Sequence, residues 1–128
     1  MRIAVTILGL ILLIPMGLQA FTIFAISDAV GQQDTAEAGA VGVLVALIWL
    51  VGSAIAIPAP RGAFIAFVLA ALPAFAVSGT YGDMAIWGAI ALALAVMSYV
   101  GHRQKRAADE RKAAYDARVL EALEAQRQ

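Results

Sequence analysis

Four long apolar stretches constrain this chain more than any other feature. They cover about residues 3–26, 36–57, 62–79 and 83–101, and their central parts hold no Asp, Glu, Lys or Arg. A helix needs about 20 apolar residues to cross the hydrocarbon core of a bilayer, and one charge at its centre costs about 2.5–3.5 kcal/mol. The sequence therefore predicts an all-α membrane protein in which residues 1–101 form a four-transmembrane-helix bundle.

The composition supports lipid as the surrounding solvent. Hydrophobic residues make up 62% of the 128 residues and charged residues 14%, whereas soluble domains have about 45–50% and about 25%. The chain has no cysteine and one histidine, His102, which excludes disulfides, thiolate metal sites and multi-histidine sites. We expect no enzymatic activity, no cofactor or metal, and no nucleic-acid partner.

Polar connectors separate the four stretches. Residues 27–35 are polar, residues 57–62 contain two prolines and a glycine, and residues 78–83 form a short turn. Such segments end one helix and allow the next to begin. Asp34 with Glu37 is predicted to cap the second helix, and Asp83 the fourth.

The basic residues predict the orientation in the membrane. In a four-span arrangement all of them fall on one side, in the N-terminus, the middle connector or the C-terminal tail, whereas the other two connectors are acidic. The positive-inside rule then places both termini in the cytoplasm, in a bacterial inner membrane. A cleaved signal peptide ending at Ala20 is the alternative for the first stretch; Leu18 and the apolar run beyond Ala20 favour a span.

Small residues recur every four positions along three of the stretches. Such rows allow close approach of helices in membranes, so we expect them to line helix–helix contacts. The rows are Ala38, Gly42 and Ala46 in the second stretch, Gly62, Ala66, Ala70 and Ala74 in the third, and Ala85, Ala89 and Ala93 in the fourth.

Polar side chains within the stretches are few. Gln19 is the most polar of them, and Thr22 shares its helix face. An interhelical hydrogen bond near the outer leaflet is the favoured interpretation; the lining of a polar path is the alternative. Thr6, Ser53, Ser78 and Ser98 can bond to carbonyls of their own helices and need no function.

Two tryptophans invite different predictions. Trp87 lies near a predicted span end, where indole rings favour the interface between lipid and water. Trp49 is deeper in its stretch and is expected to pack against another helix or a partner.

Residues 102–128 differ in composition from the four apolar stretches. They are rich in Ala, Arg, Lys, Glu and Gln and contain no proline, so we expect a cytoplasmic helix that continues the fourth span. An apolar stripe is predicted to dock on a partner, and a basic cluster is predicted to meet lipid headgroups, chiefly as an orientation signal. The stripe consists of Tyr115, Val119, Ala122 and Leu123, and the cluster of Arg103, Lys105 and Arg106.

In layout the chain resembles uncharacterised small four-span proteins of bacteria. The matching feature is a second span that ends in a Pro60-Arg61-Gly62 turn and is followed by spans rich in small residues, which covers half of the chain. The resemblance implies the four-helix layout and no activity. Small multidrug transporters and fluoride channels do not match, because they rely on a first-span glutamate and a pore asparagine, and this chain has neither.

These patterns favour one function and leave another open. Apolar spans, small-residue faces, short connectors and one docking tail predict a non-catalytic accessory or assembly subunit of a larger bacterial inner-membrane complex. Its partners are the lipid bilayer and other membrane subunits, or a second copy of itself. The alternative is a small oligomeric channel, a holin-like protein or a carrier with the Gln19 face along its path.

Overall fold

The computed structural model describes all 128 residues as four α-helices joined by short turns. The helices are α1 (Arg2–Ala29), α2 (Gln33–Ile55), α3 (Pro60–Ala76) and α4 (Asp83–Arg127). The predicted all-α class is confirmed. The prediction that the fourth stretch continues into the tail as one helix is also confirmed, because α4 runs for 45 residues without a break.

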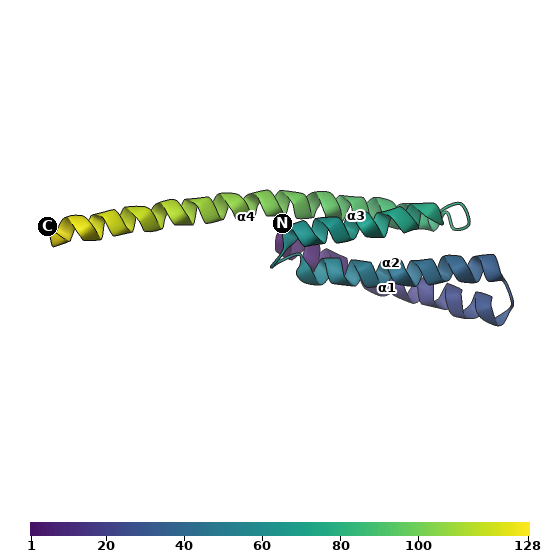
Figure 1. The fold of residues 1–128 in the computed structure, drawn as a ribbon. Helices are drawn as coiled ribbons and strands as arrows, with labels where there is room; N and C mark the ends of the chain where they lie inside the picture. The colour runs from purple at the N-terminus through teal and green to yellow at the C-terminus, as the bar shows by residue number, and fades with distance from the viewer.

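The helices form two layers (Figure 1). α1 packs along α2 and α3 along α4, while α2 joins the layers through its contact with α3 and α1 meets α4 only lightly. The N-terminus and the turn between α2 and α3 lie at one end of the bundle, and the other two turns lie at the opposite end. Beyond the first of these ends, α4 projects alone as a long extension.

Three of the helices, α1, α2 and α4, are long and apolar enough to cross a membrane. α3 is a shorter apolar helix of 17 residues. The helix ends at Ala76, three residues before the end of the predicted third span, 62–79. There the amide of Val77 donates to the carbonyl of Pro73, and the hydroxyl of Ser78 donates to that of Phe75.

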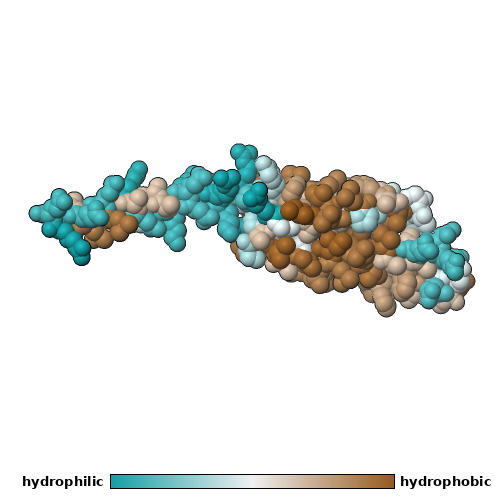
Figure 2. Space-filling view, viewed as in Figure 1, coloured by the Kyte–Doolittle hydropathy of each residue, from teal (hydrophilic) through white to brown (hydrophobic).

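The surface of the bundle suits lipid. Figure 2 shows apolar side chains over its middle, between polar atoms at the end that carries two turns and the polar extension of α4. Large side chains such as Ile14 (71% exposed), Leu18 (66%) and Leu72 (63%) point outward. Soluble monomers rarely expose a continuous apolar surface of this kind, so together with the three membrane-length helices it indicates a membrane protein.

Trp49 forms the centre of the core and joins all four helices. It is fully buried, and its indole nitrogen donates to the carbonyl of Gly9 on α1, 3.0 Å away. Its ring meets Phe67 of α3 edge-on at 5.7 Å and Trp87 of α4 at 6.2 Å between centroids. The prediction for Trp49 is confirmed. The interface prediction for Trp87 stays a prediction; its half-buried ring, near the start of α4, packs on Trp49.

The predicted helix caps are also wrong. α2 is preceded by Gln32 and α4 by Gly82, and neither helix start has a capping side-chain hydrogen bond. Asp34 and Asp83 lie inside the first turns of their helices, past the capping position. A carboxylate there still interacts favourably with the positive end of the helix dipole.

Candidate functional site

The small-residue rows of α2 and α3 lie inside the bundle. Ala38, Gly42 and Ala46 are buried on α2, and Ala66, Ala70 and Ala74 are buried on α3 behind the half-buried Gly62. A Cβ atom at Gly42 would lie 2.6 Å from Met84 of α4 and 2.8 Å from Ala20 of α1. Gly42 therefore lies where three helices meet, and a larger side chain there would force Met84 or Ala20 to shift.

The row predicted for α4 needs correction. Ala89 and Ala93 are exposed and Ala85 is half-buried, so this row faces outward. The buried small residues of α4 are instead Gly88, Ala91, Ala95, Ser98 and Gly101. A Cβ at Gly88 would lie 3.0 Å from the ring of Phe75, so Gly88 makes room for that aromatic side chain of α3. α4 is rich in alanine on several faces, and spacing alone did not distinguish the face that meets α3.

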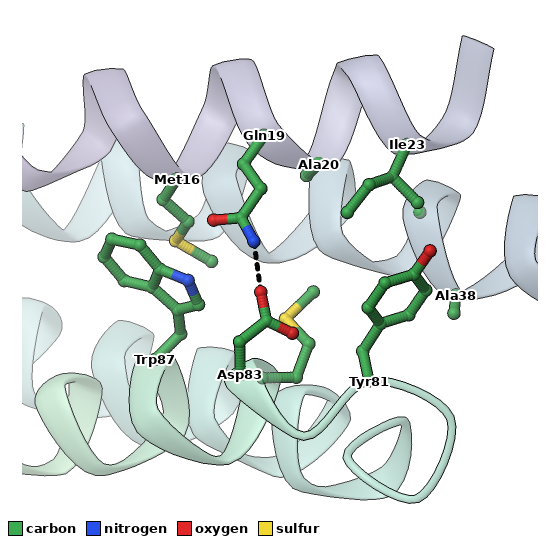
Figure 3. A pocket seen from close by; sticks show the side chains of 10 residues that line it. Met16, Gln19, Ala20, Ile23, Ala38, Tyr81, Asp83 and Trp87 are labelled. Carbon is green, nitrogen blue, oxygen red and sulfur yellow. Dashed lines mark hydrogen bonds between the residues drawn. The ribbon is translucent and has the colours of Figure 1, made fainter. Parts of the chain in front are cut away.

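Gln19 and Asp83 form the polar contact of the candidate site, between α1 and the start of α4 (Figure 3). The amide nitrogen of Gln19 donates to a carboxylate oxygen of Asp83 across the weak contact between these helices. Gln19 is thus an interhelical hydrogen-bond donor, in line with the favoured interpretation of this residue. Asp83 is a partner that the sequence analysis assigned to capping.

The pocket around this pair is small and mostly apolar. Met16, Ala20, Ile23 and Ala38 line it on one side, and Tyr81, Met84 and Trp87 on the other. Its free space of about 10 Å³ corresponds to about one water molecule. The pocket can therefore hold a water beside the amide–carboxylate pair, and it is too small for an organic substrate.

Thr22 does not extend this polar contact. Its hydroxyl donates to the carbonyl of Leu18 in its own helix at 2.7 Å, and its side chain is exposed. The amide of Gln19 turns toward Asp83 instead. The two residues share a helix face, but within one chain they do not form a joint polar path.

Two buried hydroxyl groups lack the hydrogen bonds to their own helices that the sequence allows. The Oγ atoms of Ser53 and Ser98 have no hydrogen-bond partner. Ser53 lies against α1, where a Cβ atom at Gly9 would be 2.1 Å from its Oγ. The absence of a side chain at Gly9 therefore lets α1 approach both Ser53 and Trp49 of α2.

Basic side chains gather at the end of the bundle that holds the N-terminus. Arg2 donates to the carbonyl of Ile57 at 3.4 Å, and Lys105 donates to the carbonyl of Pro58 at 3.1 Å. These carbonyls belong to the turn that follows α2, so side chains from both α1 and α4 donate hydrogen bonds to that turn. Lys105, predicted to meet headgroups, is engaged with this turn.

The other two members of the predicted basic cluster lie beside an open pocket of about 400 Å³. Arg103 and Arg106 of α4 line it together with His102 and with Arg61 of α3. Partial desolvation, followed by the charges of Arg61, Arg106 and Lys105, lowers the pKa of His102 below its ordinary value of 6.5. Arg61 was not predicted as a member of this cluster, because 42 positions separate it from Arg103 in the sequence.

Asp109 still lies beside the turn between α2 and α3, and the residues of α4 after it extend beyond the bundle. Every residue from position 106 onward is exposed, and the helix projects away from the bundle (Figure 1). The predicted docking residues are exposed on this extension: Tyr115 (68%), Val119 (39%), Ala122 and Leu123 (54%).

No group of three or more His, Asp or Glu side chains is placed to hold a metal ion. Comparisons with protein-family models, curated proteins and solved structures found no match to this chain.

Proposed function

We propose that α3 crosses the membrane together with the other three helices, so that both termini lie in the cytoplasm of a bacterium. Its 17 residues span about 25 Å at 1.5 Å per residue. A deficit of a few ångströms against a core of about 30 Å costs only fractions of a kcal/mol per ångström. The row Ala66, Ala70 and Ala74 supports this path, because it buries α3 in the bundle along its length.

The charge distribution supports the same topology. Arg2, Arg61 and the basic residues of α4 lie at or beyond one end of the bundle, while Asp28 and Asp83 lie at the other. The positive-inside rule assigns the basic end to the cytoplasm of a bacterial inner membrane.

Single cysteines test the topology cleanly, because the chain has none of its own. In intact cells, a membrane-impermeant maleimide should label Gln33→Cys and Gly79→Cys but leave Ala59→Cys and Gln104→Cys unlabelled until the cells are opened. If α3 does not cross, Gly79→Cys will report the same side as Ala59→Cys, and Gln104→Cys the same side as Gln33→Cys. Gln33→Cys and Ala59→Cys, which flank α2, serve as the controls for the two compartments.

For its role, we propose a non-catalytic accessory or assembly subunit of a larger membrane complex. The single observation that carries this proposal is the free extension of α4, which presents Tyr115, Val119 and Leu123 to the surroundings. A helix with an exposed apolar stripe is stabilised when the stripe enters a groove on a partner. Self-association through the same stripe is the other use of this surface.

Two adjacent residues of the extension offer a matched test. Val119 lies on the stripe, whereas Leu120 is rotated by about 100° away from it on an α-helix. Crosslinking should join Val119 to a defined membrane complex, Val119→Glu should abolish co-purification with that complex, and Leu120→Glu should retain it. Equal loss in both variants, or full retention in both, would remove the docking role.

The alternative, a small oligomeric channel, holin-like protein or carrier, has less support. Its proposed lining residue Gln19 is engaged with Asp83, and the adjoining space corresponds to about one water. In a purified homo-oligomer, solute flux that is lost in Gln19→Leu would favour this alternative.

A further inference from the structure

The open pocket between the start of α3 and α4 is lined by several basic side chains, and the proposed docking role does not involve them. Four basic side chains from two helices converge on it: Arg61, His102, Arg103 and Arg106. The remaining lining residues are Phe64, Ile65 and Tyr99, and no carboxylate is among them. We propose that this pocket binds the phosphate-bearing headgroup of an anionic phospholipid.

The donors of the pocket are available for a ligand. Arg2 and Lys105 bind carbonyl groups of the turn after α2. The guanidinium groups of Arg61, Arg103 and Arg106, in contrast, have no hydrogen-bond partner within the chain. Planar guanidinium groups bind phosphate oxygens through pairs of parallel hydrogen bonds. Mutual repulsion of neighbouring cations is relieved when an anion lies between them.

The first turn of α3 adds to the attraction for an anion. Arg61 is the second residue of that helix, directly after Pro60. The first backbone N–H groups of a helix have no partner within it, and the helix dipole is positive at this end. Fixed dipoles and arginine side chains therefore favour the same kind of ligand.

The apolar residues that line the pocket favour a lipid over a free anion as its ligand. Phe64 and Tyr99 lie 5.9 Å apart between ring centroids and, together with Ile65, are at least one-third exposed. On α4 the order is Tyr99, His102, Arg103 and Arg106, from the apolar bundle toward the projecting extension. A phospholipid has the same order of acyl chain and phosphate, and basic pockets between transmembrane helices bind such headgroups.

A carboxylate lies next to the pocket but does not line it. Asp109 lines a neighbouring depression that shares Arg61, His102 and Arg106 with the pocket and also includes Lys105 and the turn of Pro58 and Pro60. Asp109 forms no ion pair with these basic side chains, so their charges remain available to an anion in the pocket. The proposal depends on the chain lying in a membrane, and it does not depend on a docking role for the extension.

The test titrates the purified full-length chain in detergent with phosphatidylglycerol or phosphatidylcholine of the same acyl chains and counts bound lipids by native mass spectrometry. The pocket variant is Arg61→Gln/Arg106→Gln. The matched control, Arg111→Gln/Arg118→Gln, removes the same charge from the extension. Wild type and control should prefer phosphatidylglycerol. The pocket variant should bind it about 30-fold more weakly, because each basic side chain near a headgroup contributes a factor of about five.

Further measurements keep the proposal testable. If circular dichroism shows that the double variant is unfolded, Arg103→Gln replaces it, with an expected loss of about fivefold. Equal binding of both lipids by wild type, or equal weakening in pocket and control variants, would overturn the proposal. Displacement of the lipid by millimolar inorganic phosphate would also overturn it, because the site would then be one for a free anion.

Discussion

The indole nitrogen of Trp49 donates a hydrogen bond to the backbone carbonyl of Gly9, 3.0 Å away, in the buried contact between α1 and α2. The bond requires both residues, since only a glycine lets the indole and Ser53 approach the backbone of α1 so closely. Because Trp49 also contacts Phe67 and Trp87, one side chain connects the two layers of the bundle.

Replacement of Trp49 should therefore cost more than any change on the lipid-facing surface. Trp49→Ala should lower the free energy of unfolding by about 3–5 kcal/mol, the usual cost of removing a large buried aromatic side chain. Trp49→Phe should cost less, because it keeps a ring and loses the indole donor. Leu47→Ala, at a position 56% exposed, is the control and should be nearly neutral, because lipid replaces its contacts. Unfolding in detergent mixtures measures all three.

A methyl group at Gly9 should separate α1 from α2. Its Cβ would lie 2.1 Å from the Oγ of Ser53, so Gly9→Ala should destabilise the bundle by about 1–3 kcal/mol. At Gly17 the nearest atom would be 3.9 Å away, in ordinary contact. Gly17→Ala should therefore be neutral or stabilising by up to about 1 kcal/mol. If both variants unfold at the same denaturant concentration, the close approach at Gly9 is not a feature of the folded protein.

The contact between Gln19 and Asp83 should appear as a coupling energy. A double-mutant cycle of Gln19→Leu and Asp83→Ala should give about 0.5–1.5 kcal/mol, the usual contribution of one hydrogen bond. The cycle of Thr22→Val with Asp83→Ala is the control and should be additive, because Thr22 bonds to its own helix. Strict additivity for Gln19 and Asp83 would show that they do not interact in the membrane.

The single histidine should report the charge of the basic pocket. The pKa of His102 is lowered, so the folded state takes up this proton less readily than the unfolded chain. The stabilising contribution of the neutral ring is present above pH 6.5 and is lost as the pH falls through the lower pKa of the folded state. The imidazole resonances should titrate below pH 6.5 in phosphatidylcholine, and His102→Gln should weaken the pH dependence of unfolding. A pKa at or above 6.5 in phosphatidylcholine would contradict the prediction.

Apolar runs were sufficient to predict the helices and the continuous α4, because hydrophobic length and helix propensity are local properties of the chain. The same reasoning placed Trp49 inside, since a large ring deep in a span lacks an aqueous interface. The prediction from the spacing of small residues was wrong for Ala89 and Ala93, because alanine is as acceptable on a lipid-facing surface as on a packed one.

The sequence by itself determined that this chain belongs in lipid and that its basic residues and the apolar stripe of its tail lie outside the apolar spans. Only the tertiary structure decided which side chains meet. Asp83 pairs with Gln19 rather than capping α4, and Arg61 joins His102 and Arg103. The physical reason is that transfer into lipid depends on the composition of each segment alone, whereas packing depends on how helices distant in the chain are rotated against one another.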